Sequence, residues 1–242
     1  MDTQYVTRIE DRVHSTQDYA RTEFESHFDD TPVLVVANAQ EAGRGRRGRE
    51  WWSAPRAMLA SIAMKEPRGE VLTLVPLAAG VALHDALEHE LGIMTELKWP
   101  NDVLLGGVKA GGVLSELKDG VLVVGAGLNL WWPDAPAGAT AVVEDDPGEA
   151  LAAEIAQEWA KRLLLLIADL ASFDRMRYTE LCSTIGMHIS WRPEGSGRAI
   201  AIDHDGALVV ATDDGSVVLR SDEVSHVRPA TIPTDPELDH TT

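Results

Sequence analysis

Residues 97–130 decide the fold, and they read LKWPNDVLLGGVKAGGVLSELKDGVLVVGAGLNL. Short apolar runs alternate here with turn-forming residues, namely Pro100-Asn101-Asp102, Gly106-Gly107 and Asp119-Gly120. Residues of these types favour the tight turns that join neighbouring antiparallel strands. The stretch therefore predicts a series of hairpins, with strands over residues 97–99, 103–105, 112–117 and 121–130.

On both sides of these hairpins, the sequence predicts helices and buried strands that would pack against the sheet. Ser15 and Asp18 have the spacing of a helix start, and Gly92 is typical of the end of a helix. Continuous short apolar runs predict buried strands, whereas apolar residues at steps of four predict amphipathic helices. The predicted helices cover residues 18–28, 71–91, 147–170 and 173–184, and the predicted strands cover residues 33–37 and 58–64.

The C-terminal part changes to short strands only, from Gly186 onward. The turn pairs Asp205-Gly206 and Asp214-Gly215 separate some of these strands, and a series of such short strands predicts a small β-barrel. The strands are expected over residues 187–191, 198–202, 207–211, 216–219 and 223–228. The sequence thus predicts an α+β domain over residues 1–185, a barrel over residues 186–230 and a loose tail over residues 231–242.

Composition narrows the classes of function. The chain has 242 residues and a net charge of −18, so its surface repels nucleic acid and we expect no DNA partner. Its single cysteine, Cys182, excludes an internal disulfide. No apolar run predicts a membrane span, and the first residues lack the apolar core of a signal peptide, so we expect a cytoplasmic protein without a membrane partner.

One segment concentrates positive charge against this acidic background. Residues 43–49 read GRGRRGR, where glycines allow close backbone approach and arginines offer paired donors to phosphate or carboxylate. The segment predicts a cationic flap over an anionic ligand. A solvated charged loop and an RNA contact remain alternatives, and RNA binding would weaken steeply with salt.

Two further motifs stay ambiguous when each is taken alone. Lys109 opens an apolar strand that contains two glycines, which suits either a ligand contact or an exposed edge. Residues 125–129 read GAGLN, but the third glycine and the following helix of a dinucleotide-binding fingerprint are missing. We find no phosphate-binding P-loop and no zinc-binding pattern, so no protein-bound metal site is expected.

Taken in this order, the motifs strongly resemble those of biotin protein ligase (biotin–[acetyl-CoA-carboxylase] ligase), in the form without an N-terminal DNA-binding domain. The resemblance rests on residues 15–17, 40–51, 98–102, 109–112 and 125–129 and extends from about residue 9 to residue 229. It implies a class II synthetase-like catalytic domain with a mixed, largely antiparallel sheet, followed by an SH3-like barrel. It also implies that biotin and ATP, with Mg²⁺, yield biotinyl-5′-AMP, and that biotin then passes to a lysine of a biotin carboxyl carrier domain.

The resemblance also implies a set of site residues. Lys109 and Arg46 are expected to be catalytic. The residues expected to bind biotin are Ser15, Thr16, Gln17, Gln40, Gly43, Arg44, Gly45, Arg46, Lys109 and Gly112. Those expected on the nucleotide side are Arg46, Arg49, Trp51, Lys98 and Asn129, and Asp102 is a candidate for an outer contact to Mg²⁺.

The sequence departs from the family pattern at two places. Gln17 stands where the family usually has asparagine, and Ser221-Asp222-Glu223 replaces a glycine-containing turn. A lipoate-type ligase or acyltransferase, similar in fold, remains the main alternative, although the arginine-rich segment before Trp51 argues against it. The sequence leaves open whether the protein is a monomer or a homodimer.

Overall fold

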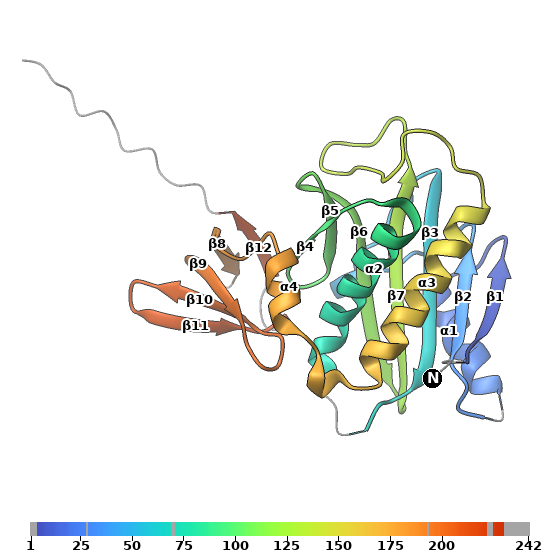
Figure 1. Ribbon diagram of the computed structural model, residues 1–242, viewed down its shortest axis with the longest axis horizontal. Coiled ribbons are helices and arrows are strands. Elements are labelled where there is room, and N and C mark those ends of the chain that lie inside the picture. Colours follow the sequence, from blue (N-terminus) through green and yellow to red (C-terminus); the bar gives the residue numbers. More distant parts are fainter. Residues whose placement is uncertain (1–3, 28, 69–70, 193, 222–224, 230–242) are drawn as a thin grey trace, which may run out of the picture.

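A computed structural model describes residues 4–27, 29–68, 71–192, 194–221 and 225–229 (Figure 1). Its largest element is a seven-stranded sheet with the strand order β1-β2-β3-β7-β6-β5-β4. The strands are β1 (Val6–Glu10), β2 (Val33–Ala37), β3 (Arg56–Lys65), β4 (Glu96–Lys98), β5 (Asp102–Leu105), β6 (Val108–Lys118) and β7 (Val121–Trp131). Only β1 and β2 pair in parallel, so the predicted mixed, largely antiparallel sheet is confirmed.

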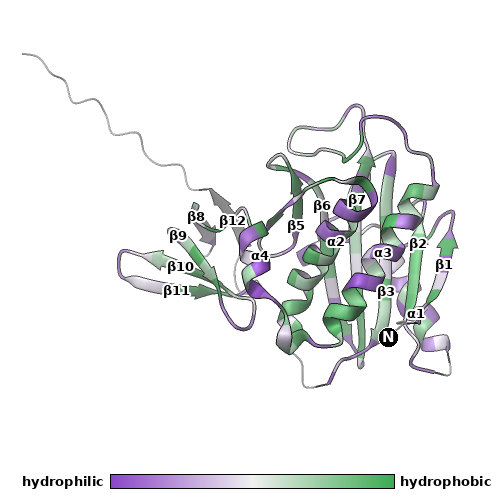
Figure 2. Ribbon diagram, in the orientation of Figure 1, coloured by the Kyte–Doolittle hydropathy of each residue, from purple (hydrophilic) through white to green (hydrophobic). Residues whose placement is uncertain are grey.

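Helices cover both faces of this sheet. Along β2, Leu34 and Val36 contribute to the core under α2 (Val75–Leu91) and α3 (Ala150–Ile167), whereas Val33 and Val35 contribute to the core under α1 (Thr16–Ser26). Successive side chains of a strand point to opposite faces, so a strand covered on both faces is apolar throughout. Figure 2 shows hydrophobic residues concentrated on α2 and the strands beside it.

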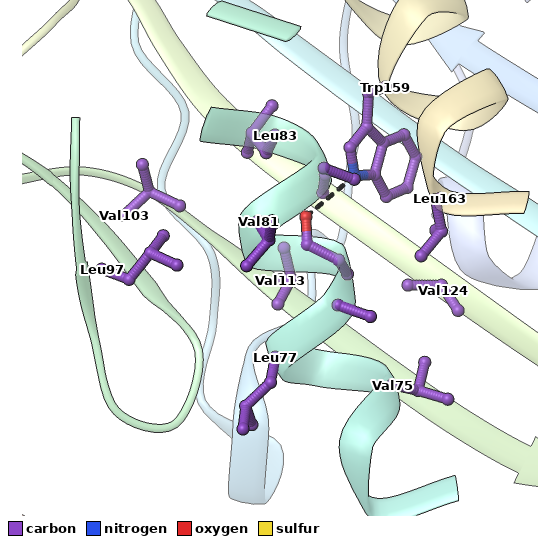
Figure 3. Packing of buried hydrophobic residues seen from close by; sticks show 14 of the residues in the cluster. Val75, Leu77, Val81, Leu83, Leu97, Val103, Val113, Val124, Trp159 and Leu163 are labelled. Carbon is purple, nitrogen blue, oxygen red and sulfur yellow. Dashed lines mark hydrogen bonds between the residues drawn. The ribbon is translucent and has the colours of Figure 1, made fainter. Parts of the chain in front are cut away.

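The main core lies between α2, α3 and the sheet. Trp159 of α3 is fully buried, and its indole N–H donates to the carbonyl of Ala79 at 3.2 Å (Figure 3). This bond satisfies a polar group that would otherwise be costly to bury. No helix in the described ranges has both the length and the apolar character that a membrane crossing requires.

A second sheet follows α4 (Arg175–Leu181) and lies beside it in Figure 1. Its five strands occur in the order β11-β10-β9-β8-β12. They are β8 (His188–Arg192), β9 (Gly195–Ile202), β10 (Leu208–Thr212), β11 (Gly215–Leu219) and β12 (Ser225–Pro229). Five predicted strands thus occur close to their predicted places, although residues 222–224 and 230–242 lie outside the described ranges. Closure into a barrel and the boundary at residue 185 stay predictions.

Three differences from the predicted elements have physical causes. The edge strand β1 was not predicted, because its sequence VTRIE mixes polar with apolar residues. The helix predicted over residues 173–184 ends at Leu181, because residues 182–183 instead lie along β4, where Ser183 N–H donates to Leu97 O at 2.8 Å. The helix predicted from residue 71 starts at Val75, after a short 3-10 turn, η2 (Leu72–Leu74).

Candidate active site

A cavity of about 540 Å³ lies where the start of α1, the Gly/Arg segment, the β4–β5 turn and the glycine-containing parts of β6 and β7 meet. Most of the residues that the sequence predicts for the site line this cavity. They are Thr16, Gln17, Gln40, Arg44, Gly45, Arg46, Arg49, Trp51, Lys98, Lys109 and Gly112. Residues far apart in the sequence are therefore brought together by the sheet order.

Three predicted site residues do not line the cavity. Ser15 is buried at the N-terminal end of α1, and Gly43 lies at the base of the Gly/Arg segment. Asn129 is buried on β7, where its Nδ2 donates to Thr140 O at 3.0 Å. The Oδ1 atom of Asn129 has no hydrogen-bond partner among the described residues. A ligand role for these three residues stays a prediction.

Polar side chains form one wall of the cavity, and of these Thr16 and Ser61 are buried whereas Gln40 is partly exposed. Gln40 Oε1 accepts hydrogen bonds from the Thr16 backbone N–H at 2.8 Å and from Thr16 Oγ1 at 3.0 Å. Ser61 of β3 donates its hydroxyl to Thr16 Oγ1 at 2.8 Å. Sequence reasoning missed Ser61, whose only signal is a single serine within an apolar strand. Because these bonds fix the hydroxyl and amide groups, the wall presents donors and acceptors in set directions.

Gln17 contributes an unpaired acceptor to the same wall. Its side chain is only 5% exposed, and its Nε2 donates to Leu114 O at 3.2 Å. This bond directs the amide, and the buried Oε1 has no partner among the described residues. An unpaired buried oxygen is costly, so a ligand that donates an N–H group to it is favoured.

Two cations of the cavity, Arg44 and Lys109, are paired with acidic groups. Arg44 bonds to Asp18 at 2.8 Å and to Glu116 at 2.9 Å, at the rim. Lys109 Nζ bonds to Asp102 Oδ1 at 2.5 Å and lies 5.6 Å from the centre of the Trp51 ring. Lys109 is thus held by an ion pair and a cation–π contact, with its ammonium group at the cavity surface.

The Gly/Arg segment is itself ordered by backbone hydrogen bonds. Gly45 N–H donates to Arg49 O at 2.7 Å, and Trp51 N–H donates to Gly43 O at 2.9 Å. Arg46, within η1 (Arg46–Gly48), donates to Asn101 Oδ1 at 3.3 Å and to the carbonyl of Ser221. The segment therefore forms a hydrogen-bonded strap over the cavity, and Arg46 connects it to the β4–β5 turn.

Trp51 packs directly on the backbone of β7 at Gly127. A Cβ atom at position 127 would lie 2.6–2.9 Å from three atoms of the Trp51 ring, which is closer than such atoms approach. We expect Gly127→Ala to displace Trp51 and to lower the free energy of unfolding by about 1–3 kcal/mol, measured by urea denaturation. Gly80→Ala is the control, because its Cβ would meet Leu97 at an ordinary 3.4 Å; an equal loss in both variants would contradict the packing.

Carboxylates that could bind a metal ion occur inside and outside the cavity. Glu50 and Asp102 are the acidic residues that line it. Within the described ranges, clusters of three metal-ligating side chains occur elsewhere, at His84–Asp85–Glu88, His89–Glu90–Glu158 and Asp203–His204–Asp205. When phosphates supply most of its ligands, Mg²⁺ needs only one or two carboxylates from the protein. The cavity offers that number, in Glu50 and Asp102.

The cavity thus places cations beside a wall of fixed donors and acceptors, an arrangement that suits an acidic ligand. The sequence model of the Biotin/lipoate A/B protein ligase family matches residues 9–130, and the chain belongs to this family. It is 36% identical to the biotin–[acetyl-CoA-carboxylase] ligase of Paracoccus denitrificans, over 78% of this chain and 88% of that protein. It is 29% identical to the Mycobacterium tuberculosis enzyme of the same name, over 81% and 79%.

Solved structures with a similar fold are also of biotin protein ligases. A point mutant of the biotin protein ligase from Aquifex aeolicus, in complex with biotin, matches with a TM-score of 0.76 and 26% identity, over 93% of this chain and 99% of that one. The same ligase in complex with biotin and ATP shares the fold, with a TM-score of 0.73 and 24% identity over equal shares. The resemblance to biotin protein ligase is confirmed, and so is the prediction of an enzyme of the biotin ligase class.

Proposed function

We propose that this chain joins biotin to ATP as biotinyl-5′-AMP and then transfers the biotinyl group to a lysine of a biotin carboxyl carrier domain. The observation that carries the proposal is the meeting of Arg44, Arg46 and Lys109 in one cavity, beside the unpaired oxygen of Gln17. The names of the relatives and the bound biotin and ATP in the Aquifex aeolicus ligase support it.

The first step needs this positive charge. A carboxylate oxygen of biotin attacks the α-phosphorus of ATP, the bond to the β-phosphate breaks, and pyrophosphate leaves. Two negative charges about 4 Å apart repel by roughly 4 kcal/mol at an effective dielectric constant near 20. Lys109 and Arg46 would offset this repulsion and stabilise the charge that develops on the phosphate, without any protein nucleophile.

The two halves of the cavity would take the two substrates. Thr16, Gln17, Gln40 and Gly112, with Ser15 and Gly43 behind them, would hold biotin, whose ureido group carries two N–H donors and one carbonyl acceptor. Arg49, Trp51, Lys98 and Asn129 would face the nucleotide. Mg²⁺ would enter as part of the MgATP substrate, where it neutralises phosphate charge, and Asp102, which lines the cavity, would contact its water shell.

The second step is attack of the acceptor lysine nitrogen on the carbonyl carbon of the mixed anhydride, with AMP as the leaving group. Until the acceptor arrives, the anhydride must be protected from water. The strap of residues 43–51, with Arg44 and Gly45 over the biotin half, would cover it, because its hydrogen bonds hold it across the cavity.

A substitution of Gln17 tests whether this half of the cavity binds biotin. We expect Gln17→Met, which keeps the length of the side chain but removes its amide group, to weaken biotin binding about 10–100-fold in isothermal titration calorimetry. The loss follows because a ureido N–H would then be buried without an acceptor. Gln157→Met, on the exposed side of α3, is the control and should bind biotin normally. Unchanged binding by the Gln17 variant would remove this residue from the biotin half.

The modification that the protein adds to a carrier domain tests the proposed function. The protein is incubated with MgATP, a carrier domain of acetyl-CoA carboxylase, and either biotin or lipoate, and the carrier is analysed by mass spectrometry. We expect biotin on a single lysine and no modification with lipoate. Lipoylation instead would assign the chain to the lipoate branch of the family, and no modification with either acid would refute the proposal.

A further inference from the structure

Two segments that are distant in the sequence, at Thr184 and at Gly206, hold the β4–β5 turn in place. Trp99, at the start of this turn, is 3% exposed. Its backbone N–H donates to Thr184 Oγ1 at 3.1 Å, and its indole N–H donates to the carbonyl of Gly206 at 2.9 Å. Thr184 is also only 3% exposed and lies between α4 and β8. Both bonds are therefore buried and directional.

The residues that follow Trp99 contact two of the cations of the site, Arg46 and Lys109. Asn101 is fixed by its Nδ2, which donates to Val113 O at 2.8 Å, and its Oδ1 accepts from Arg46 at 3.3 Å. Asp102 accepts from Lys109 Nζ. A shift of the turn at Trp99 would therefore move the partners of Arg46 and Lys109 together.

The Gly206 turn has little freedom to move away from Trp99. Thr73 Oγ1 donates to Asp205 O at 2.6 Å, which ties the turn to η2, just before α2. Gly206 has a φ of +82°, and a Cβ there would lie 3.2–3.3 Å from Leu74 and Leu77. Arg220 also forms an ion pair with Asp205 across the base of this turn, and this hydrogen bond lowers the pKa of the Asp205 carboxyl group. The second sheet thus presents a rigid acceptor to the indole.

The second sheet also reaches the strap directly, since Ser221, after β11, accepts from Arg46. The sheet therefore touches the site at two points: the carbonyl of Gly206 on Trp99 and the carbonyl of Ser221 on Arg46. Figure 1 shows this sheet and α4 next to β4, on the side of the main sheet where these contacts occur.

We propose that Trp99 is a positioning residue for the ligase reaction: held by Thr184 and Gly206, it sets the β4–β5 turn so that Asn101 and Asp102 keep Arg46 and Lys109 in place. The second sheet then acts on the chemistry through Trp99, without contacting biotin itself. The effect of Trp99 on catalysis rests on the proposed function, whereas its effect on the position of the strap does not.

The test uses variants that remove one buried bond each. Thr184→Val keeps the shape but removes the acceptor of the Trp99 N–H, and Thr184→Ser restores it. Trp99→Phe removes the indole donor. Ser183→Ala is the matched control, because the Ser183 hydroxyl donates to Leu97 O, which keeps a second bond from the Ser183 backbone N–H. Circular dichroism and thermal unfolding establish which variants are folded.

Two measurements are made on the full chain. The first is the rate of tryptic cleavage at the arginines of residues 44–49 without substrates; we expect Thr184→Val and Trp99→Phe to be cut several-fold faster than the control and Thr184→Ser. The second is biotinyl-5′-AMP formation, in which we expect kcat to fall about 10–100-fold while the KM for biotin changes less than about twofold.

Each outcome is decisive. Cleavage and kcat equal to those of the control in a folded Thr184→Val variant would overturn the proposal, as would a rise in KM for biotin at constant kcat. If the unmodified protein forms no biotinyl-5′-AMP, the proposed function fails. The cleavage rates then still decide whether Trp99 holds the strap.

Discussion

Replacing Lys109 by alanine is expected to slow formation of biotinyl-5′-AMP by about a hundredfold to a thousandfold while the protein stays folded. Lys109 lies at the cavity surface, where its ion pair with Asp102 and its contact with Trp51 hold the ammonium group. The carboxylate and the α-phosphate approach each other most closely in the transition state, where further negative charge builds up on the phosphate. Loss of the Lys109 ammonium group should therefore lower kcat more than it weakens biotin binding.

The measurement is the rate of biotinyl-5′-AMP formation by chromatography, with biotin binding followed separately by calorimetry. Lys118→Ala, on the same strand but at its exposed end, is the matched control and should react at the normal rate. A Lys109→Ala variant with near-normal kcat would show that another group supplies the positive charge.

Replacing Arg46 by glycine is expected to release the adenylate. Arg46 bonds to Asn101 and to the carbonyl of Ser221, so its removal cuts two of the contacts that hold the strap over the cavity. A mixed anhydride that escapes reacts with any accessible lysine. We therefore expect biotin on bystander proteins such as serum albumin, at least tenfold above the unmodified protein, together with weaker retention of the adenylate.

Blotting with labelled streptavidin measures this release in a mixture of carrier domain and albumin. Arg68→Gly is the control, because it removes an exposed guanidinium from a loop that does not line the cavity. If the Arg46 variant still modifies the carrier alone, at a reduced rate, the strap does not retain the intermediate and Arg46 acts on the phosphate only.

The hairpins over residues 97–130 could be predicted because their turns are local. Pro100-Asn101-Asp102, Gly106-Gly107 and Asp119-Gly120 each occur between strands that pair with their neighbours in sequence. The edge strand β1 could not be predicted in this way. Its partner β2 is parallel and separated from it by α1. The partly buried residues of β1 also mix polar with apolar side chains, so they leave no apolar run.

The site residues could be predicted to the extent that they carry charge or lie in distinctive motifs. Arg44, Arg46, Arg49, Lys98 and Lys109, which the sequence predicts for the site, line one cavity, and their roles there stay predictions. Ser61 and Thr184 could not be found, because a single hydroxyl within an apolar segment is common and its partner is set by the tertiary structure. The acidic partners of Arg44, Asp18 and Glu116, are likewise distant in sequence and were missed.

The proposed reaction requires that the cations of the strap and Lys109 bring the carboxylate of biotin, and of no other acid, against ATP. Exchange of labelled pyrophosphate into ATP measures this reaction without an acceptor protein. We predict exchange that requires biotin and is absent with lipoate or octanoate at equal concentration. Exchange that proceeds with lipoate or octanoate but not with biotin would contradict the account.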